Sequence, residues 1–276
     1  MTNTTAPETT QVLSPDGTSI GVFVSGHGRP LVVVPGTTSD HSTWRLLTPL
    51  LESHVAVHAV DRRGRGSSGD SPVYSLDKEY DDIAAVVDAA AGAWGGPVDL
   101  LGHSYGGNVA FGAALRTRNL RRLALYEGWP VPNLAHRTIA PELTAALDEL
   151  LAQGDPERML ETFFRDVVHM SNDEITTIKA SAAWPARVAA APTVPREIRA
   201  FSEQAFDPAW AARITVPVLL LVGWDSPADI KADPEVVADA LPDARLTVLR
   251  GQMHVAHLTD PAGLAAVLLS FLHEPG

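Results

Sequence analysis

Residues 102–106 of the chain read Gly-His-Ser-Tyr-Gly and lie between two stretches of opposite local preference. The apolar run 97–101 before them is typical of a buried strand, and the Ala-rich stretch 109–115 after them is typical of a helix. A turn this sharp needs glycines on both sides, because a Cβ there would clash with the backbone. Such a turn lifts a serine hydroxyl clear of the sheet, so we predict that Ser104 is a nucleophile rather than an incidental turn residue.

Short apolar runs alternate with helical patterns through the first third of the chain, which predicts an α/β fold with a parallel sheet. The Ser-Pro-Asp-Gly turn at 14–17 is typical of a hairpin. Ser75 can cap a helix whose apolar residues recur at helical spacing. The expected strands are 12–13, 20–24, 31–34 and 55–60, and the expected helices are 42–51 and the one after Ser75.

Composition narrows the class of protein. A chain of 276 residues with 45% hydrophobic content suffices for one large α/β domain with an insertion, or for two smaller domains. No run approaches the roughly 18 apolar residues of a membrane span, and residues 1–10 carry no signal-peptide pattern, so we expect a flexible N-terminus and a cytoplasmic protein. The absence of cysteine excludes disulfides and thiolate metal sites. A net charge of -12 argues against nucleic acid as a partner.

Residues 64–69 match the Gly-x-Gly-x-x-Gly fingerprint of dinucleotide-binding proteins. No helix is expected to begin at Gly69, Pro72 interrupts the next few residues, and no second strand ends in an acidic residue about 20 positions later. We therefore expect no nucleotide cofactor. No metal is expected either, because His254 and His257 lack a third ligand in a recognisable pattern.

Several segments together resemble the α/β-hydrolase family. Besides 102–106, they are 31–34 with the following Pro-Gly-Thr-Thr, the Asp-Arg-Arg-Gly-Arg-Gly-Ser-Ser stretch at 61–68, and Gly-Gln-Met-His at 251–254. Many members have His-Gly where this chain has Pro35-Gly36, a difference that leaves the role of the next backbone amide intact. We expect 61–68 to order loops beside the site rather than take part in chemistry.

The resemblance implies a mostly parallel central sheet flanked by helices, with a helical cap inserted in it. It covers most of the chain except about 130–213, where the alternation of strands and helices stops. We therefore expect the α/β-hydrolase core to consist of 11–129 and 214–276, and 130–213 to form the cap. Short helices are expected in the cap at 141–151 and 156–168.

A serine hydroxyl becomes an effective nucleophile when an imidazole takes its proton. In this family the histidine comes last in the chain, in the loop between the last strand and the last helix. Here that loop lies between the apolar run 245–249 and a helix that Pro261 should begin, and it contains His254. We predict that His254 is the base, with His257 as a weaker rival.

The triad acid must hold the other imidazole nitrogen and stabilise the imidazolium as it forms. Many family members carry it in a Gly-x-x-Asp-Pro pattern after the strand that here spans 216–222. Residues 223–227 read Gly-Trp-Asp-Ser-Pro, which places Ser226 at the acid's position and Asp225 one residue early. A shift of one residue at a strand end can turn a side chain to the opposite side, so Asp225 departs from the pattern.

Glu127 is the other candidate, because some members carry the acid after the preceding strand, here 123–126. A carboxylate at the carboxyl end of a buried strand needs a reason to be there. We favour Glu127, keep Asp225 as the alternative acid, and place Asp229 third.

The resemblance also implies an oxyanion hole formed by the backbone amides of Thr37 and Tyr105. The expected cap would lie over the carboxyl ends of the strands, where open α/β sheets bind ligands. We expect the substrate pocket to include Trp129, Phe163, Trp184 and Met253.

The predicted function is a serine hydrolase that cleaves an ester, lactone or thioester of an apolar small molecule through an acyl-enzyme on Ser104, without a cofactor. Epoxide and haloalkane hydrolysis are disfavoured, since those relatives carry a carboxylate nucleophile. One alternative is C–C bond hydrolysis or a cyclisation in specialised metabolism by the same triad. Another is a non-catalytic ligand-binding receptor on the same fold. The sequence does not indicate an oligomeric state.

Overall fold

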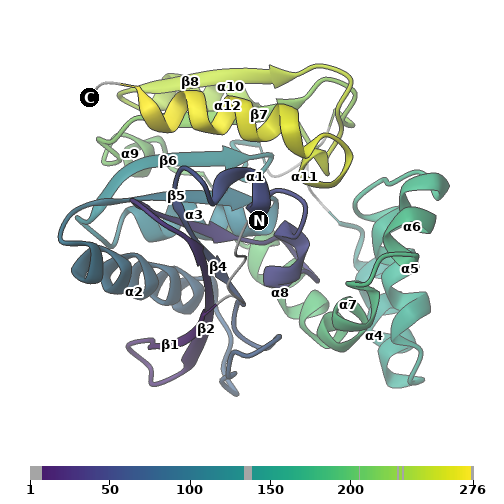
Figure 1. Ribbon diagram of the computed structural model, residues 1–276. Helices are drawn as coiled ribbons and strands as arrows, with labels where there is room; N and C mark the ends of the chain where they lie inside the picture. The colour runs from purple at the N-terminus through teal and green to yellow at the C-terminus, as the bar shows by residue number, and fades with distance from the viewer. Residues whose placement is uncertain (1–7, 134–138, 205, 229, 232, 275–276) are drawn as a thin grey trace, which may run out of the picture.

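The computed structural model describes residues 8–133, 139–204, 206–228, 230–231 and 233–274. Its strands are β1 (Glu8–Leu13), β2 (Ser19–Gly26), β3 (Pro30–Val34), β4 (Ala56–Val60), β5 (Val98–His103), β6 (Leu120–Tyr126), β7 (Val218–Gly223) and β8 (Ala244–Leu249). They form one eight-stranded sheet in the order β1-β2-β4-β3-β5-β6-β7-β8 (Figure 1). β2 pairs antiparallel with β1 and β4, and all other neighbours in the sheet are parallel.

The predicted hairpin is present at the N-terminal edge of the sheet. Leu13 of β1 lies opposite Ser19 of β2, and Gly17 N donates a hydrogen bond to Ser14 O across the turn (2.8 Å). Pairing begins at Glu8, so residues 8–10, expected to be flexible, are strand instead. Their two threonines are β-branched and favour extended backbone. The rest of the expected flexible terminus, residues 1–7, lies outside the described residues.

Helices cover both faces of the sheet. α2 (Leu76–Trp94) and α3 (Tyr105–Ala114) pack into one core cluster with the strands, and α1 (Thr48–Leu51) and α12 (Pro261–His273) pack into another. Strands β3, β5 and β7 are consequently buried along their whole length, as continuous apolar runs predict. Two short helices complete this part of the fold, α10 (Pro234–Ala240) and α11 (Ala256–Thr259).

The single helix expected over 42–51 is wrong. The structure has a short 3-10 helix, η1 (His41–Trp44), followed by α1, which begins at Thr48. Pro49 has no N–H to donate to the preceding turn, so it interrupts a continuous helix but fits the first turn of a new one. The carboxylate of Asp40 caps η1 by accepting a hydrogen bond from Ser42 N (2.9 Å).

Most of the described residues between β6 and β7 lie in helices, and we call this group of helices the helical segment. Its members are α4 (Pro141–Ala152), α5 (Pro156–Asp166), α6 (Asn172–Lys179), α7 (Trp184–Ala190), η3 (Ala191–Thr193), α8 (Val194–Ser202) and α9 (Pro208–Ala211). Side chains of α4 to α8 share a hydrophobic core of their own. Figure 1 shows α4 to α7 grouped beyond the arrowheads of β6 and β8, that is, at the carboxyl ends of the parallel strands.

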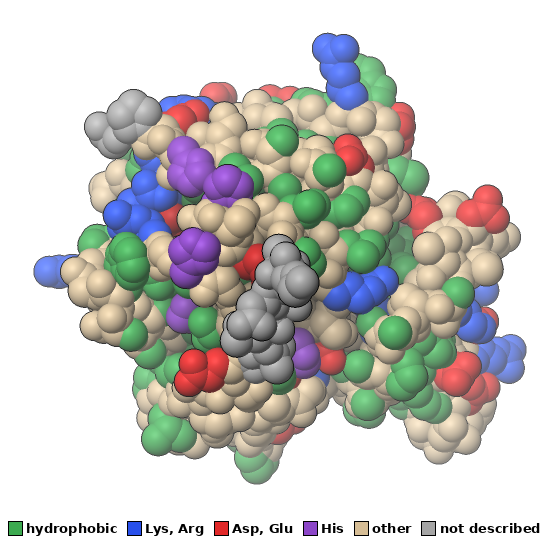
Figure 2. All heavy atoms as spheres, in the orientation of Figure 1, with side chains coloured by type: hydrophobic (Ala, Val, Ile, Leu, Met, Phe, Trp, Pro, Cys, Tyr) green, Lys and Arg blue, Asp and Glu red, His purple; other side chains and the backbone are tan. Residues whose placement is uncertain are grey.

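Charged side chains of both signs are spread over the face of the molecule drawn in Figure 2, without a continuous basic surface on that face. Among the described helices, none is both long enough and apolar enough to cross a membrane.

Candidate active site

Ser104 occupies the sharp turn between β5 and α3. Its φ of 54° and ψ of -130° are uncommon for a residue with a side chain, and such strain concentrates at functional sites. Two backbone hydrogen bonds hold the turn, from Ser104 N to Tyr126 O (2.9 Å) and from Gly107 N to Ser104 O (2.8 Å). The turn therefore has the geometry that the pentapeptide predicts, at the carboxyl end of a central strand.

Glu127 and His254 form a buried pair beside this turn. His254 Nδ1 lies 2.6 Å from Glu127 Oε2, and Glu127 Oε1 accepts a hydrogen bond from Gly223 N at 2.7 Å. Glu127 is 1% exposed and His254 7% exposed. Because a carboxylate oxygen only accepts hydrogen bonds, Nδ1 carries the hydrogen and Nε2 is left free to take up a proton. Glu127 immediately follows β6, with a left-handed φ of 44°.

The other acid candidates lie elsewhere. Asp225 is exposed, and its backbone N–H donates to Gln252 O (3.0 Å). Ser226, at the position where many relatives carry the acid, is buried, and its hydroxyl has no partner among the described residues. Asp229 lies outside the described residues. Of Glu127 and Asp225, only Glu127 contacts His254 within the described part of the chain.

His257, the rival base, lies deeper in the structure. Its Nε2 is 3.2 Å from the hydroxyl of Thr43, and no carboxylate of the described residues pairs with its ring. Burial and the nearby charge of Arg187 lower the pKa of His257 to about 3. The ring is therefore neutral, but it lacks the acid that orients a triad base.

The two predicted oxyanion donors both line the cavity that contains Ser104. Within the described part of the chain, the backbone N–H groups of Thr37 and Tyr105 have no backbone acceptor. The loop that carries Thr37 passes very close to the serine: a Cβ added at Gly36 would lie 2.9 Å from the Cβ of Ser104. Only glycine permits this approach.

A cavity of about 420 Å³ opens at Ser104 and His254, between the sheet and the helical segment. Its apolar wall comes from α4, α5 and α8 through Leu143, Phe163 and Ile198, and Glu197 adds a carboxylate. The cavity is large enough for a small organic molecule and is mostly apolar, as small-molecule sites usually are.

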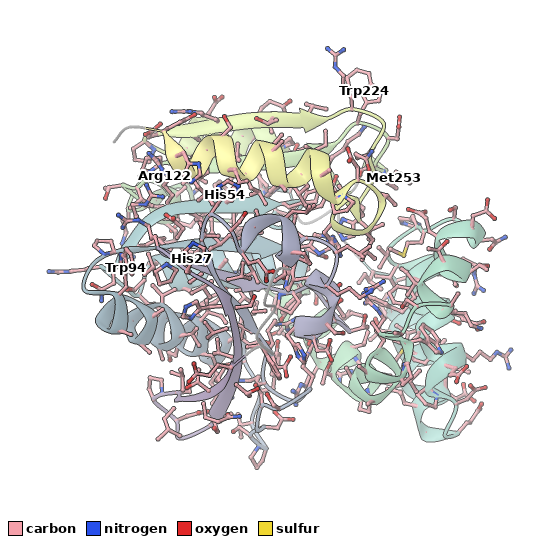
Figure 3. The ribbon with its side chains drawn as sticks, viewed as in Figure 1. His27, His54, Trp94, Arg122, Trp224 and Met253 are labelled. Carbon is pink, nitrogen blue, oxygen red and sulfur yellow. The ribbon has the colours of Figure 1, made fainter. Side chains whose placement is uncertain are left out.

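Of the expected pocket residues, Phe163 lines this cavity, whereas Trp129, Trp184 and Met253 are not among the described residues that do. Trp129 is fully buried in the core beneath α2 and α3. Trp184 packs into the core of the helical segment. Met253 uses its carbonyl to accept a hydrogen bond from the Tyr126 hydroxyl, and Figure 3 places it beside α11. The same view shows Trp224, which is 63% exposed, projecting outward.

The arginine-rich loop after β4 ties the core to the helical segment. Arg62 forms two hydrogen bonds with Glu79 of α2 (2.8 and 2.6 Å) and lies 3.0 Å from Glu197 of α8. Arg65 also pairs with Glu197. These side chains are buried, and the loop is held by ion pairs, which agrees with the structural role expected for 61–68. The part played by Glu197 was missed, because no local pattern marks a glutamate that pairs with arginines about 130 residues away.

The glycine fingerprint in this loop opens no helix. Gly64 N donates to Gly69 O (2.8 Å), which closes the loop on itself, and α2 begins at Leu76. One group of potential metal ligands is present among the described residues, Asp40, His41 and Asp61. His41 Nδ1 lies 2.8 Å from Asp61, whose other carboxylate oxygen accepts from Ser67 N, so these groups already satisfy one another.

Comparison with known proteins agrees with this geometry. Residues 31–267 match the model of the alpha/beta hydrolase family. The chain is 34% identical to an alpha/beta hydrolase from Sphaerobacter thermophilus, whose crystal structure has a TM-score of 0.82 over 95% of this chain and 100% of that one. An enol-lactonase from Burkholderia xenovorans, 20% identical with a TM-score of 0.72 over 96% of this chain and 100% of that one, shares the fold.

Curated relatives are more distant or match over a shorter stretch. N-formylmaleamate deformylase of Pseudomonas putida is 35% identical over 127 residues, which are 45% of this chain and 46% of that protein. (E)-2-((N-methylformamido)methylene)succinate hydrolase of Acinetobacter baylyi is 25% identical over 91% of this chain and 92% of that protein. The chain spans from 12% to 56% of the length of the first three curated relatives it matches. The family match and the Sphaerobacter structure together show that the chain belongs to the α/β-hydrolase family.

Proposed function

We propose that the protein is a serine hydrolase that cleaves an ester, lactone or thioester bond in a small, largely apolar molecule through an acyl-enzyme on Ser104. The observation that carries this proposal is the buried Glu127–His254 pair at the wall of the cavity that contains the strained Ser104 turn. A carboxylate, an imidazole and a hydroxyl in this arrangement are the parts of a nucleophilic triad.

In the proposed mechanism, Ser104 Oγ attacks the substrate carbonyl while His254 Nε2 takes its proton. Glu127 stabilises the imidazolium that forms and keeps the ring oriented. The negative charge that develops on the carbonyl oxygen is stabilised by the N–H groups of Thr37 and Tyr105, each donor contributing on the order of 3 kcal/mol. The imidazolium then protonates the leaving group, and a water molecule activated by His254 hydrolyses the acyl-enzyme.

The helical segment would serve as the cap that selects the substrate, because Phe163 and Ile198 form part of the cavity wall. The names of the relatives include a methyl ester esterase and an enol-lactonase, which supports the bond types proposed here. Other relatives are named as a deformylase and as a semialdehyde hydrolase. No observation in this structure favours their chemistry over ester or lactone cleavage.

A fluorophosphonate probe tests the proposal, because it forms a stable adduct only with an activated serine. We expect an adduct on Ser104 located by mass spectrometry, hydrolysis of short aryl esters by the wild type, and loss of both in Ser104→Ala. A folded wild-type protein that forms no adduct on Ser104 near neutral pH would refute the serine-hydrolase function and favour the non-catalytic receptor. An adduct without ester or lactone turnover would instead favour another bond type.

A further inference from the structure

A second, smaller cavity lies directly beside the first. It has a volume of about 40 Å³ and shares Thr37, Ser104, Phe163 and His254 with the larger one. A cavity of this volume has room for a polar group of a few atoms, such as a substituent of a substrate held at Ser104.

The wall of the inner cavity is mostly apolar but includes a few charged and polar side chains. Arg187 of α7 is 6% exposed and His257 is 1% exposed, and both contribute to its wall. Arg187 Nε, His257 Nδ1 and His103 Nδ1 are buried atoms of this wall without a hydrogen-bond partner in the described structure. His103 Nε2 donates to His254 O (2.7 Å), so Nδ1 of its neutral ring can only accept a hydrogen bond. Buried polar groups are nearly always paired, so nitrogens left without a partner beside a cavity are available to a polar ligand there.

The hydrogen bonds of Thr43 assign the proton on His257. Arg187 Nη2 donates to Thr43 Oγ1 (3.3 Å), which lies 3.2 Å from His257 Nε2. Nε2 of His257 is the one acceptor that the described residues offer to the hydrogen of the Thr43 hydroxyl, so this hydroxyl donates to Nε2 and the neutral ring of His257 carries its proton on Nδ1. The unpartnered atoms of Arg187 and His257 are thus both N–H donors, and they match a group that only accepts hydrogen bonds.

Charge distinguishes Arg187 from the buried arginines of the loop after β4. Arg62, Arg63 and Arg65 each pair with a buried carboxylate, whereas none of the described residues places a carboxylate within 4.0 Å of Arg187. Burial lowers the pKa of Arg187 to about 10, so the guanidinium remains charged at neutral pH. An unpaired buried cation is unfavourable, and a bound anion would compensate it.

We propose that Arg187 and His257 bind a carboxylate group of the substrate in the inner cavity, so that the preferred substrate is an ester or lactone of a molecule that carries a free carboxylate. A carboxylate only accepts hydrogen bonds and matches the guanidinium in charge and planar shape. This inference rests on the proposed function. The apolar remainder of the substrate would occupy the larger cavity.

Arg187 also contacts the loop that carries the predicted oxyanion donor. Its Nη1 donates to the hydroxyl of Thr38 (2.8 Å), next to Thr37. A purely structural arginine that holds this loop would support the hydrolysis of charged and neutral esters equally. A carboxylate-binding arginine would act only on the charged ones. The ratio of the two rates therefore separates these roles.

The experiment compares methyl hydrogen adipate, which has one free carboxylate, with dimethyl adipate, which has none. Hydrolysis is followed by acid release in the wild type, in Arg187→Met and in Arg199→Met. Arg199 is the matched control, because it lies on α8 with an exposed guanidinium paired with Asp148. We expect the wild type to favour the half-ester in kcat/KM by roughly 10- to 100-fold, the range for a hydrogen bond to a charged group.

Arg187→Met should abolish this preference, mainly through a higher KM for the half-ester, and Arg199→Met should retain it. If Arg187→Met does not fold, Arg187→Gln replaces it in the same comparison, because glutamine still offers a hydrogen-bond donor to Thr38 but carries no charge. Equal losses for the two esters in the Arg187 variant, or no preference in the wild type, would overturn the carboxylate site while leaving the hydrolase function in place.

If neither ester is hydrolysed, isothermal titration calorimetry measures the binding of each ester to the Ser104→Ala variant. Tighter binding of the half-ester than of the diester, lost when Arg187→Met is added, would support the carboxylate site even though the proposed hydrolysis had failed. Equal binding of the two esters to Ser104→Ala would overturn the site.

Discussion

Replacing Glu127 by glutamine changes one atom of a buried side chain and should remove nearly all activity. Both carboxylate oxygens are occupied, one by the N–H of Gly223 at 2.7 Å and the other by Nδ1 of His254 at 2.6 Å. A glutamine has a single oxygen, so it can accept from only one of these donors.

Each orientation of the glutamine has its own cost. If its oxygen accepts from Gly223, its NH₂ group faces Nδ1 of His254 and favours the tautomer with the proton on Nε2, which cannot take the serine proton. If its oxygen faces Nδ1 instead, two N–H groups meet in a buried place, at a cost of about 1–3 kcal/mol. The first orientation disfavours the catalytic tautomer, and the second, which permits it, is rarely populated because of this cost.

Loss of the negative charge adds to this effect, because nothing then stabilises the imidazolium. A charge pair 4 Å apart contributes roughly 4 kcal/mol at an effective dielectric constant of 20. Together the two effects predict a fall in kcat of roughly 10⁴-fold, the size of the effect of a carboxylate-to-amide change in a serine-protease triad.

The assay is hydrolysis of an aryl ester, with thermal melting to show that the variant is folded. The matched control is Asp225→Asn, an exposed carboxylate that should stay within about twofold of the wild type. A folded Glu127→Gln protein that keeps more than about a tenth of the wild-type kcat would refute the assignment of the acid. So would an equal loss in Asp225→Asn.

Three further predictions concern the active turn and the stability of the fold. Gly128→Ala should prevent formation of the turn at Ser104, because the new Cβ would overlap the carbonyl oxygen of Ser104. Gly92→Ala should stabilise α2 by about 1 kcal/mol, because Gly92 lies within the helix and its Cβ would point into open space. Fluorophosphonate labelling tests the Gly128 variant, and the melting temperature tests the Gly92 variant. Normal labelling of Gly128→Ala would contradict the close contact between Gly128 and Ser104. His257, whose pKa burial lowers from 6.5 to about 3, is neutral when folded, whereas the unfolded chain takes up a proton below about pH 6.5. The free energy of unfolding should therefore decrease as the pH is lowered from about 6.5 to about 3, by up to ~1.4 kcal/mol per pH unit. Urea unfolding at several pH values measures this slope, and His257→Gln should flatten it. An unchanged slope in the variant would argue against a buried neutral ring.

The sequence alone predicted the family, the strands of the first third of the chain and the sharp turn at Ser104. These features depend on short-range rules: glycines flanking a serine, apolar runs of strand length, and a serine that caps a helix. Ser75 does cap α2, accepting from Lys78 N at 3.3 Å. The position of His254 followed from chain order, which a family resemblance preserves.

The sequence favoured Glu127 over Asp225, but only the tertiary structure shows that Glu127 contacts His254. Both follow buried strands, and the direction of a side chain at a strand end depends on one backbone angle, here the left-handed φ of 44° at Glu127. It also decided which apolar residues reach the cavity, because Trp129 and Trp184 are equally suited to a core and to a pocket.

The surroundings of Arg187 and Glu197 could not be predicted from the sequence. Nothing local distinguishes a buried arginine from an exposed one, and their roles depend on contacts with Thr38 and Arg65, which lie more than 125 residues away in the chain. The sequence determined where the chain makes its strands and the sharp turn at Ser104, because those choices depend on neighbouring residues. The packing of the helical segment onto the sheet decided which charges are buried together, because that depends on residues the chain brings together only when it folds.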